Sequence, residues 1–309
     1  MPHRFLRIGE LSRRTGLSAD VIRAWERRYD LLSPARTEGN YRLYSLDDLA
    51  RLRLMQHYLG RGITAGQAAG LVHQVQNAAL DSNPGLPPAD VRSALRILRE
   101  SLESFDENPA DRALSRLLGV FAAGAVLRDV VLPYLRELGE RWQRGEVSIA
   151  QEHFASSFLE GWMLSMARGW GQGQPGRRRA VLACVPGERH TLGLIAFGLA
   201  LRDLGWRVAY LGADAPVRAV DDAAGATSAD AVILACQRPE AFAAVADEIR
   251  AMTARHAIAV GGRGITQASG EWLADRTLPA DPIVAAHLLT ARVSERSSPG
   301  AFGPGSVAR

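Results

Sequence analysis

One short segment, Glu188-Arg189-His190-Thr191-Leu192-Gly193, contains residue types that bind a metal or a planar cofactor. It follows the apolar run 179–185, which predicts a buried strand, and precedes the apolar run 192–204, which predicts a helix. Open α/β sheets bind ligands where a strand ends and a helix begins. There the imidazole of His190 can point out of the sheet, while Glu188 accepts from the far ring nitrogen and fixes its tautomer. The bare pattern also fits a polar loop whose histidine has no special role.

Strands and helices alternate around this segment, which predicts a parallel sheet with right-handed crossovers. The predicted strands are 179–185, 207–211, 230–236 and 257–260, and the predicted helices are 192–204, 216–225, 239–254 and 282–292. Gly193 would let a bulky ligand approach the first of these helices. Gly212 follows the second strand, and Gly261 and Gly262 follow the fourth. These small residues predict a slot at the carboxyl edge of the sheet.

Two short helices are predicted near the amino terminus. Residues 8–15 are amphipathic and end at Gly16, and Ser18 can cap a second helix over residues 19–29. Two helices joined by a tight turn form a helix-turn-helix, whose second helix enters the DNA major groove. Residues 1–61 hold twelve arginines against seven acids, whereas the remainder holds twenty-five against twenty-six. This distribution predicts an anion-binding head on a nearly neutral body.

A hairpin and a further helix follow the helix-turn-helix. Two extended halves of residues 31–44 flank the turn Glu38-Gly39-Asn40. Ser45 can cap a helix over residues 46–59, with Asp48 at the capping-box position. The predicted order is therefore helix, turn, helix, wing and helix.

This order, over about residues 5–75, resembles the MerR family of transcriptional regulators. The matching motifs are Ile8-Gly9-Glu10-Leu11, Thr15-Gly16-Leu17-Ser18, Ile22-Arg23-Ala24-Trp25-Glu26-Arg27-Arg28-Tyr29 and Gly39-Asn40-Tyr41-Arg42-Leu43-Tyr44. The resemblance implies that five side chains contact phosphates or groove edges of double-stranded operator DNA, namely Arg23, Arg28, Arg36, Tyr41 and Arg42.

Four helices predicted in the middle of the chain suggest a bundle. They are residues 89–103, 109–121, 126–144 and 149–170. Trp142 lies at the end of the third, and a capping box starting at Ser148 places Glu152 and His153 in the first turns of the fourth. The spacing W-x9-E-H resembles the helical cap of cobalamin-binding photoreceptor regulators. A half-buried tryptophan and a capping glutamate are the alternative interpretation.

The motifs E-x-H-x-x-G, L-G and G-G at successive strand ends resemble the cobalamin-binding domain of methionine synthase and related mutases. In that family the histidine is the lower axial ligand of cobalt, and the nucleotide tail enters a slot beside the sheet. The resemblance implies His190 as the metal ligand and Glu188 as its acidic partner. It assigns the tail slot to Gly193, Gly261 and Gly262. Where the family usually has a serine after the third strand, this chain has Ala235 or Cys236.

The three regions together, over about residues 5–290, resemble the CarH-type light-dependent repressors. The predicted domains are a winged helix-turn-helix head at 1–78, a linker at 79–88, a four-helix-bundle cap at 89–171, a Rossmann-like parallel α/β cobalamin-binding domain at 177–293 and a flexible tail at 294–309. In that group, adenosylcobalamin assembles a pair of dimers that holds operator DNA in the dark, and light breaks the cobalt–carbon bond. The resemblance implies a non-enzymatic repressor, with Trp142, Glu152 and His153 near the upper adenosyl group.

One position departs from that group. In light-sensing members the residue directly after the tryptophan is a histidine, and this histidine ligates cobalt after photolysis. This chain has Gln143 at that position. His153 could substitute, or the protein could sense cobalamin or another tetrapyrrole without light. The sequence is also compatible with a haem sensor that uses His190 as axial ligand and with a corrinoid methyl-carrier module.

Bulk features predict a cytoplasmic location. The sequence has no signal peptide pattern and no apolar run near the roughly 20 residues that a membrane-spanning helix needs. Its two cysteines, Cys184 and Cys236, both lie in strand-like apolar runs. Isolated buried thiols are typical of a reducing compartment and predict neither a disulfide framework nor a metal site.

Overall fold

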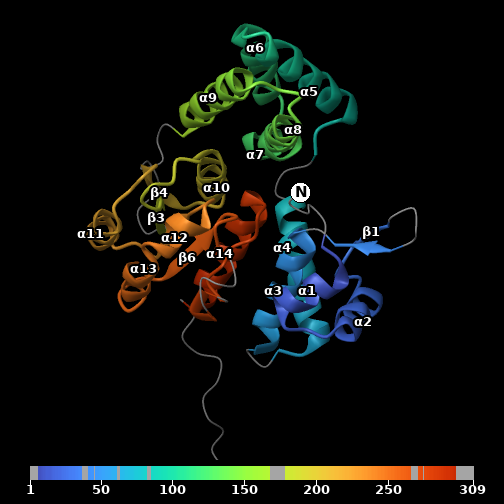
Figure 1. Ribbon diagram of the computed structural model, residues 1–309, viewed down its shortest axis with the longest axis vertical. Coiled ribbons are helices and arrows are strands. Elements are labelled where there is room, and N and C mark those ends of the chain that lie inside the picture. The colour runs from blue at the N-terminus through green and yellow to red at the C-terminus, as the bar shows by residue number, and fades with distance from the viewer. Residues whose placement is uncertain are drawn as a thin grey trace, which may run out of the picture.

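The computed structural model describes residues 6–36, 41–44, 46–60, 63–81, 85–167, 178–265, 271–273 and 275–296. Along the chain lie a helical head with a two-stranded wing, a helical bundle and a four-stranded parallel sheet with flanking helices (Figure 1). The predicted combination of a helical head, helical middle and parallel α/β domain is therefore confirmed. No helix in the described ranges is both long and apolar enough to cross a bilayer.

The head follows the predicted order of elements. They are α1 (Ile8–Thr15), α2 (Ala19–Tyr29), β1 (Ala35–Arg36), β2 (Arg42–Leu43) and α3 (Leu46–Gly60), and a further helix that was not predicted, α4 (Ala65–Asp81), follows them. Gly16 ends α1 with a left-handed φ of 71°, and the Ser18 hydroxyl caps α2 by accepting from Val21 N at 3.2 Å. β1 and β2 are antiparallel, as a wing requires. The predicted turn Glu38-Gly39-Asn40 and the Ser45 cap lie outside the described residues.

The bundle elements are α5 (Pro88–Glu103), α6 (Glu107–Leu118), α7 (Ala123–Val126), the π-helical turn η1 (Leu127–Val131), α8 (Leu132–Gln143) and α9 (Ile149–Met166). The sequence predicts one regular helix over residues 126–144, and this detail is wrong, because η1 interrupts it. A π-turn marks an interrupted hydrogen-bond pattern, and Pro133, which has no N–H to donate, is the second residue of the helix that follows. The capping box of Ser148 and Gln151 is present at the start of α9, as predicted.

The sheet domain comprises β3 (Arg179–Cys184), α10 (Leu192–Asp203), β4 (Arg207–Gly212), α11 (Val217–Thr227), β5 (Ala231–Ala235), α12 (Pro239–Ala243), α13 (Ala246–Met252), β6 (Ile258–Gly261) and α14 (Pro282–Arg296). All strands are parallel, in the order β4-β3-β5-β6. The chain passes from β3 to β4 on one side and then crosses back to β5 on the other side of β3. The end of β3 is therefore a topological switch point. The single helix predicted over residues 239–254 is two short helices, because Val245 has a non-helical φ of −123°.

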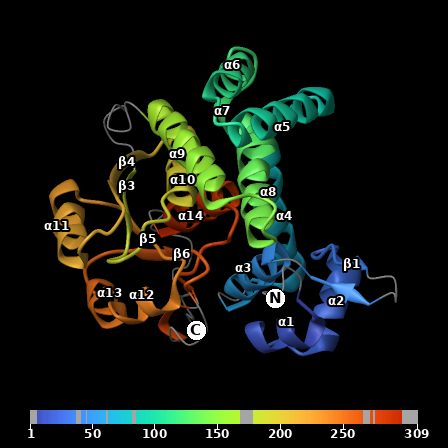
Figure 2. The same cartoon turned by 45° about the horizontal axis from the view of Figure 1, so that its top comes forward.

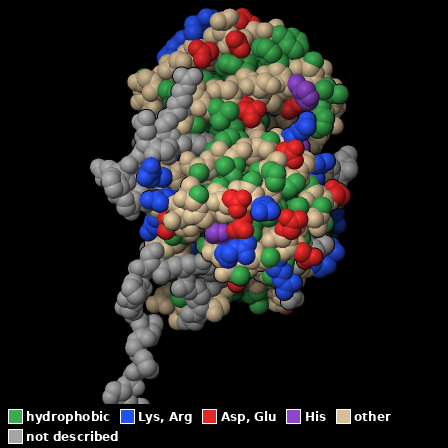
Figure 3. Space-filling model, turned by 90° about the vertical axis from the view of Figure 1, so that its left-hand side faces the viewer, with side chains coloured by type: hydrophobic (Ala, Val, Ile, Leu, Met, Phe, Trp, Pro, Cys, Tyr) green, Lys and Arg blue, Asp and Glu red, His purple; other side chains and the backbone are tan. Residues whose placement is uncertain are grey.

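Alternate residues of the strands face two different cores. Val181 and Val232 face one core with α11 and α13, whereas Leu182 and Ile233 face the other with α10 and α14. Figures 1 and 2 show these helices on opposite sides of the sheet. On the side of the molecule drawn in Figure 3, acidic and basic side chains are interspersed, as expected for the nearly neutral body.

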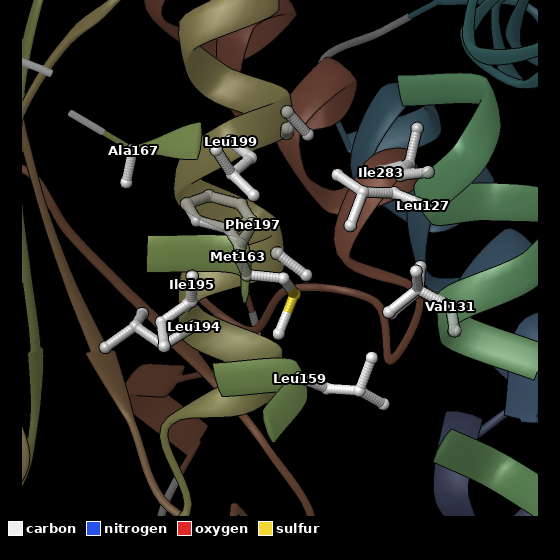
Figure 4. Close-up of a cluster of buried hydrophobic side chains, with 14 of the residues drawn as sticks. Leu127, Val131, Leu159, Met163, Ala167, Leu194, Ile195, Phe197, Leu199 and Ile283 are labelled. Atoms are coloured by element: carbon white, nitrogen blue, oxygen red, sulfur yellow. The ribbon is translucent and has the colours of Figure 1, made fainter. Parts of the chain in front are cut away.

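The bundle and the sheet domain share one continuous core. Leu159 and Met163 of α9 pack against α10, where Leu194 and Phe197 belong to the same cluster (Figure 4). A shared core holds two elements in a defined relative position, because separating them would expose apolar surface to water. The shared core therefore places the bundle over one face of the sheet.

The head contacts the sheet domain through α4 and α14. Leu288 of α14 is buried within the core of the head. Figure 2 shows α2 and the wing strand β1 on the side of the head that faces away from the sheet domain. In the part of the chain that the structure describes, the docked head thus keeps α2 and β1 on the side away from the sheet domain (Figure 2).

Candidate functional site

Glu188 is fully buried in the turn after β3 and is the centre of the candidate site. Its Oε1 accepts from the backbone N–H groups of Arg189 and His190 at 2.8 and 2.9 Å, and its Oε2 accepts from Gln237 N at 2.6 Å. Burial alone would raise the pKa of this carboxyl. The hydrogen bonds from His190 and Gln237 outweigh burial and lower the pKa of Glu188 to about 2. The side chain is therefore an anion at neutral pH.

His190 places its imidazole between this anion and the solvent. Its Nδ1 lies 2.5 Å from Glu188 Oε1, while 69% of the side chain is exposed. Because an ionised carboxylate only accepts hydrogen bonds, Nδ1 carries the proton, and in the neutral imidazole Nε2 is then the nitrogen with a lone pair. The structure thus joins the two residues as the motif suggests, and the metal-ligand role of His190 stays a prediction.

The turn that carries His190 is held by loops from two neighbouring strands. Asp214, after β4, donates its N–H to Glu188 O at 2.9 Å, and its carboxylate accepts from Gly187 N at 2.6 Å. The guanidinium of Arg238, after β5, donates to Gly187 O. These contacts fix the backbone beneath the imidazole before any ligand binds.

The donor set fits a metal that is already held by a planar macrocycle. Among the described residues, no group of three or more histidine, cysteine, aspartate and glutamate side chains could hold a bare metal ion. Cys184 and Cys236 are buried free thiols, and burial raises the pKa of Cys184 to about 12. One imidazole at a switch point matches a single axial ligand rather than a closed coordination shell.

The glycines of the predicted site have different reasons to be glycine. Gly193 is exposed, and an added Cβ there would meet nothing within 4 Å, so a ligand can approach it. Gly212 has a positive φ of 84°, and a Cβ on Gly261 would make only ordinary contact at 4.0 Å. Gly262 has a φ of 105°, and its Cβ would lie 2.1 Å from the carbonyl oxygen of Cys236. Chain packing therefore requires glycine at 262, whether or not a ligand enters beside it.

Gly264 is a structural glycine that the sequence analysis missed. An added Cβ would lie 2.8 Å from Arg238 N, so the loop after β6 packs directly on the backbone of the loop after β5. Glycines at strand ends cannot be divided into ligand-facing and backbone-facing from sequence, because both environments select against a side chain.

Trp142, Glu152 and His153 occupy adjacent ends of α8 and α9. Trp142 is 46% exposed, although tryptophan is mostly buried in folded proteins. Glu152 accepts from the Ser156 hydroxyl at 2.7 Å, and its other oxygen lies 2.6 Å from His153 Nδ1. Gln143, the last residue of α8, is exposed. The adjoining ends of α8 and α9 therefore carry an exposed tryptophan and a hydrogen-bonded pair of carboxylate and imidazole.

The helix α9 connects this end of the bundle with the histidine turn. Glu160 of α9 accepts from the Thr191 hydroxyl at 2.5 Å, directly beside His190. Glu160 lies two turns after Glu152, roughly 12 Å along the helix axis. No sequence motif identified this contact, because the two residues are far apart in sequence and carry no shared pattern.

The recognition helix α2 exposes the cations that the sequence analysis selected. Arg23 lies 3.5 Å from Asp20, one turn earlier, and is 49% exposed. Arg28 is exposed, with its guanidinium 5.6 Å from the ring centroid of Tyr29. Tyr41, beside the wing, is also exposed. Arg36 lies in β1, and its side chain is outside the described set.

Arg42 joins the wing to the recognition helix. Its Nε donates to Glu26 Oε1 at 2.8 Å, and Tyr44 donates its hydroxyl to Glu26 Oε2 at 3.0 Å. The hydrogen bond and charge of Glu26 raise the pKa of Arg42. The sequence assigned Arg42 to DNA without finding this internal partner. Asp48 likewise accepts from Ser33 N at 3.1 Å and so ties α3 to the segment before the wing.

Comparisons with known proteins match all three regions. The model of the MerR HTH family regulatory protein matches residues 6–75, and two B12 binding domain models match residues 94–164 and 178–287. The chain is 33% identical over 221 residues to the HTH-type transcriptional repressor CarH of Myxococcus xanthus, covering 70% of this chain and 73% of that protein. It is 33% identical over 268 residues to the HTH-type transcriptional repressor CarA of the same organism, covering 84% and 87%.

The fold is also similar to a solved corrinoid protein. The monomethylamine corrinoid protein of Methanosarcina barkeri aligns with a TM-score of 0.53 and 14% identity, covering 63% of this chain and 96% of that one. This likeness supports the fold alone. The identity to two repressors over most of the chain, together with the MerR and B12-binding matches, places this protein in the family of MerR-type transcriptional repressors with B12-binding domains that includes CarH and CarA.

Proposed function

We propose that this protein is a light-responsive repressor that binds operator DNA as an adenosylcobalamin-assembled oligomer and releases the DNA after illumination. The observation that carries the proposal is the exposed imidazole of His190, fixed by the buried anion of Glu188 at the switch point of the sheet. On this proposal the protein is a cytoplasmic regulator and not an enzyme.

The residues present fit a cobalt corrinoid. His190 would hold the metal through Nε2, while Glu188 keeps the proton on Nδ1 and raises the basicity of the ligand. Gly193 leaves room beside the imidazole, and Gly212, Gly261 and Gly262 lie at the same carboxyl edge of the sheet. The nucleotide tail would lie along this edge.

The bundle would cover the opposite face of the cofactor. Trp142 would pack on the upper ligand, and Glu152 and His153 would offer hydrogen bonds to its polar groups. Adenosylcobalamin supplies a cobalt–carbon bond that light breaks. Loss of the adenosyl group would remove the packing partner of Trp142, so that the bundle could shift relative to the sheet domain.

Assembly would control DNA binding through effective concentration. Each MerR-type head binds DNA with an affinity that depends on salt, and linking several heads in one particle strengthens the combined binding without new contacts. An assembly organised as a dimer of dimers would place several heads on one operator. Its dissociation would therefore release the DNA.

Gln143 favours a second candidate function, a cobalamin-dependent repressor that does not use light. The exposed residue directly after Trp142 is an amide, which is a poor ligand for cobalt. If no residue at this position can bind cobalt, the illuminated state would lack the protein–cobalt bond that distinguishes it from the dark state. His153 is the imidazole on the bundle that could take this role instead.

One spectroscopic experiment separates the candidate ligands. The purified protein is mixed with adenosylcobalamin, methylcobalamin or haem, separated from free ligand, and its absorption spectrum is recorded before and after illumination. Retention of adenosylcobalamin and a light-induced spectral change support the proposal. Retention of haem alone, or of methylcobalamin in strong preference to adenosylcobalamin, would contradict it.

Arg28→Ala is expected to weaken operator binding and to lower the slope of log affinity against log salt by about one unit for a lost phosphate contact. The reason is the exposure of its guanidinium on the recognition helix. Fluorescence anisotropy over a salt series measures both quantities. Arg96→Ala, which removes an exposed arginine from α5, is the matched control and should leave the slope unchanged.

A further inference from the structure

Thr191 uses its hydroxyl in an unusual way for a residue at a helix start. It is the N-cap residue of α10, where a threonine side chain normally accepts from a backbone N–H of the first turn. Here the side chain makes no such capping bond. The hydroxyl instead donates to Glu160 Oε1 of α9 at 2.5 Å. The start of α10 thus forgoes its own cap for a contact with the bundle.

This contact lies in a partly buried polar cluster beside an apolar interface. Thr191 is 6% exposed, and Leu159, the residue before Glu160, is fully buried in the core shared by the bundle and the sheet domain. The Tyr210 side chain on β4 also interacts with the Thr191 side chain. Burial, and then the charges of Cys184 and Glu160, raise the pKa of Tyr210 to about 12. The cluster therefore contains the Glu160 carboxylate, the Thr191 hydroxyl and a neutral Tyr210 phenol.

The cluster lies next to His190, the candidate metal ligand. Thr191 directly follows His190, whose own side chain is held from the other side by Glu188. A movement of α9 would displace Glu160, and the short hydrogen bond would transmit that displacement to the residue beside the imidazole. The neighbouring contacts of Asp214 and Arg238 come from within the sheet domain and cannot report the position of the bundle.

We propose that Glu160 is a positioning residue for His190, and that its bond to Thr191 couples the placement of the bundle to the placement of the lower cobalt ligand. This inference rests on the proposed function, since it takes His190 as the ligand. Because the bond links the bundle to the residue beside His190, displacement of the bundle after a change at the upper face of the cofactor would also weaken the binding of His190 to cobalt.

The test measures the lower ligand directly in the full-length protein loaded with cobalamin and reduced to cobalt(II). A nitrogen ligand splits the electron paramagnetic resonance lines of cobalt(II), and 15N-labelling of the protein changes this splitting only when the nitrogen belongs to the protein. Wild-type protein should show the protein-derived splitting throughout. In Glu160→Ala and Thr191→Val the fraction with a protein nitrogen should fall, and cobalamin affinity should fall by about tenfold, as expected for losing one hydrogen bond to a charged group.

Three further variants show whether the hydrogen bond is the cause. Glu160→Gln keeps an acceptor oxygen, so its cobalamin affinity should remain within about twofold of that of wild type. This change is much smaller than that expected for losing a hydrogen bond to a charged group. Glu100→Ala, which removes an exposed glutamate from α5, is the matched control and should change nothing. The double variant Glu160→Ala/Thr191→Val should be no worse than either single variant, because both remove the same contact.

The outcomes separate this inference from the proposed function. If wild-type protein shows no protein-derived nitrogen, the assignment of His190 fails and the inference fails with it. If wild type shows the splitting and Glu160→Ala shows it equally, with unchanged affinity, the inference alone is wrong. Equal impairment in Glu160→Gln and Glu160→Ala, or strictly additive effects in the double variant, would also overturn it.

Discussion

Glu188→Ala should lower the free energy of unfolding by about 3 kcal/mol at pH 7 and weaken cobalamin binding by about 10- to 100-fold. The loss in stability arises because the backbone N–H groups of Arg189, His190 and Gln237 would lose a buried acceptor. The loss in affinity arises because a partner that orients a metal-binding histidine typically has this effect. Urea unfolding and cobalamin titration measure the two quantities separately.

The stability difference should depend on pH in a defined direction. The folded-state pKa of Glu188 is lowered from 4.5 to about 2, so its contribution is complete above pH 4.5 and is lost as pH falls toward 2. The shift corresponds to about 3 kcal/mol. Wild type and Glu188→Ala should therefore differ most near pH 7 and converge as pH approaches 2. Equal stabilities at pH 7, or a gap that widens with acid, would contradict this assignment.

His190→Ala should weaken cobalamin binding by at least about a hundredfold while costing only about 1 kcal/mol in the stability of the free protein. The large effect follows from removing a metal ligand, which exceeds the effect of removing its orienting partner. The small effect follows from the exposure of the imidazole, which is held by its bond to the buried Glu188. Comparing this variant with Glu188→Ala separates ligation from folding.

Arg189→Ala is the matched control for this experiment. Arg189 is exposed and adjacent, and its contact with Glu188 uses only the backbone N–H. The control should bind cobalamin about as tightly as wild type. If His190→Ala also retains wild-type affinity, cobalamin binding does not use this histidine and the proposed site is wrong.

The elements around the site were predictable from sequence because their causes are local. The β3 strand and the α10 helix follow from apolar runs, and the turn between α1 and α2 follows from Gly16 and Ser18, whose conformation and cap are set by neighbouring residues. The pairing of Glu188 with His190 is also local, since only one residue separates them. Each of these features leaves a pattern within a few positions.

Contacts between distant segments left no comparable pattern. Glu160 and Thr191 are 31 positions apart, and Glu26 and Arg42 are 16 apart, so their partners depend on how the elements pack. The backbone contact that requires Gly262 likewise depends on how closely two loops approach each other. The π-turn before α8 and the break between α12 and α13 are small departures that packing can stabilise against the helical pattern.

Light scattering coupled to size-exclusion chromatography tests the central claim most directly. The mass of the full-length protein is measured without cofactor, with adenosylcobalamin in the dark, and with adenosylcobalamin after illumination. The proposed function predicts a larger particle only for the loaded protein in the dark, with a return toward the cofactor-free mass after light. A mass that is the same in all three conditions would contradict adenosylcobalamin-driven assembly and its reversal by light.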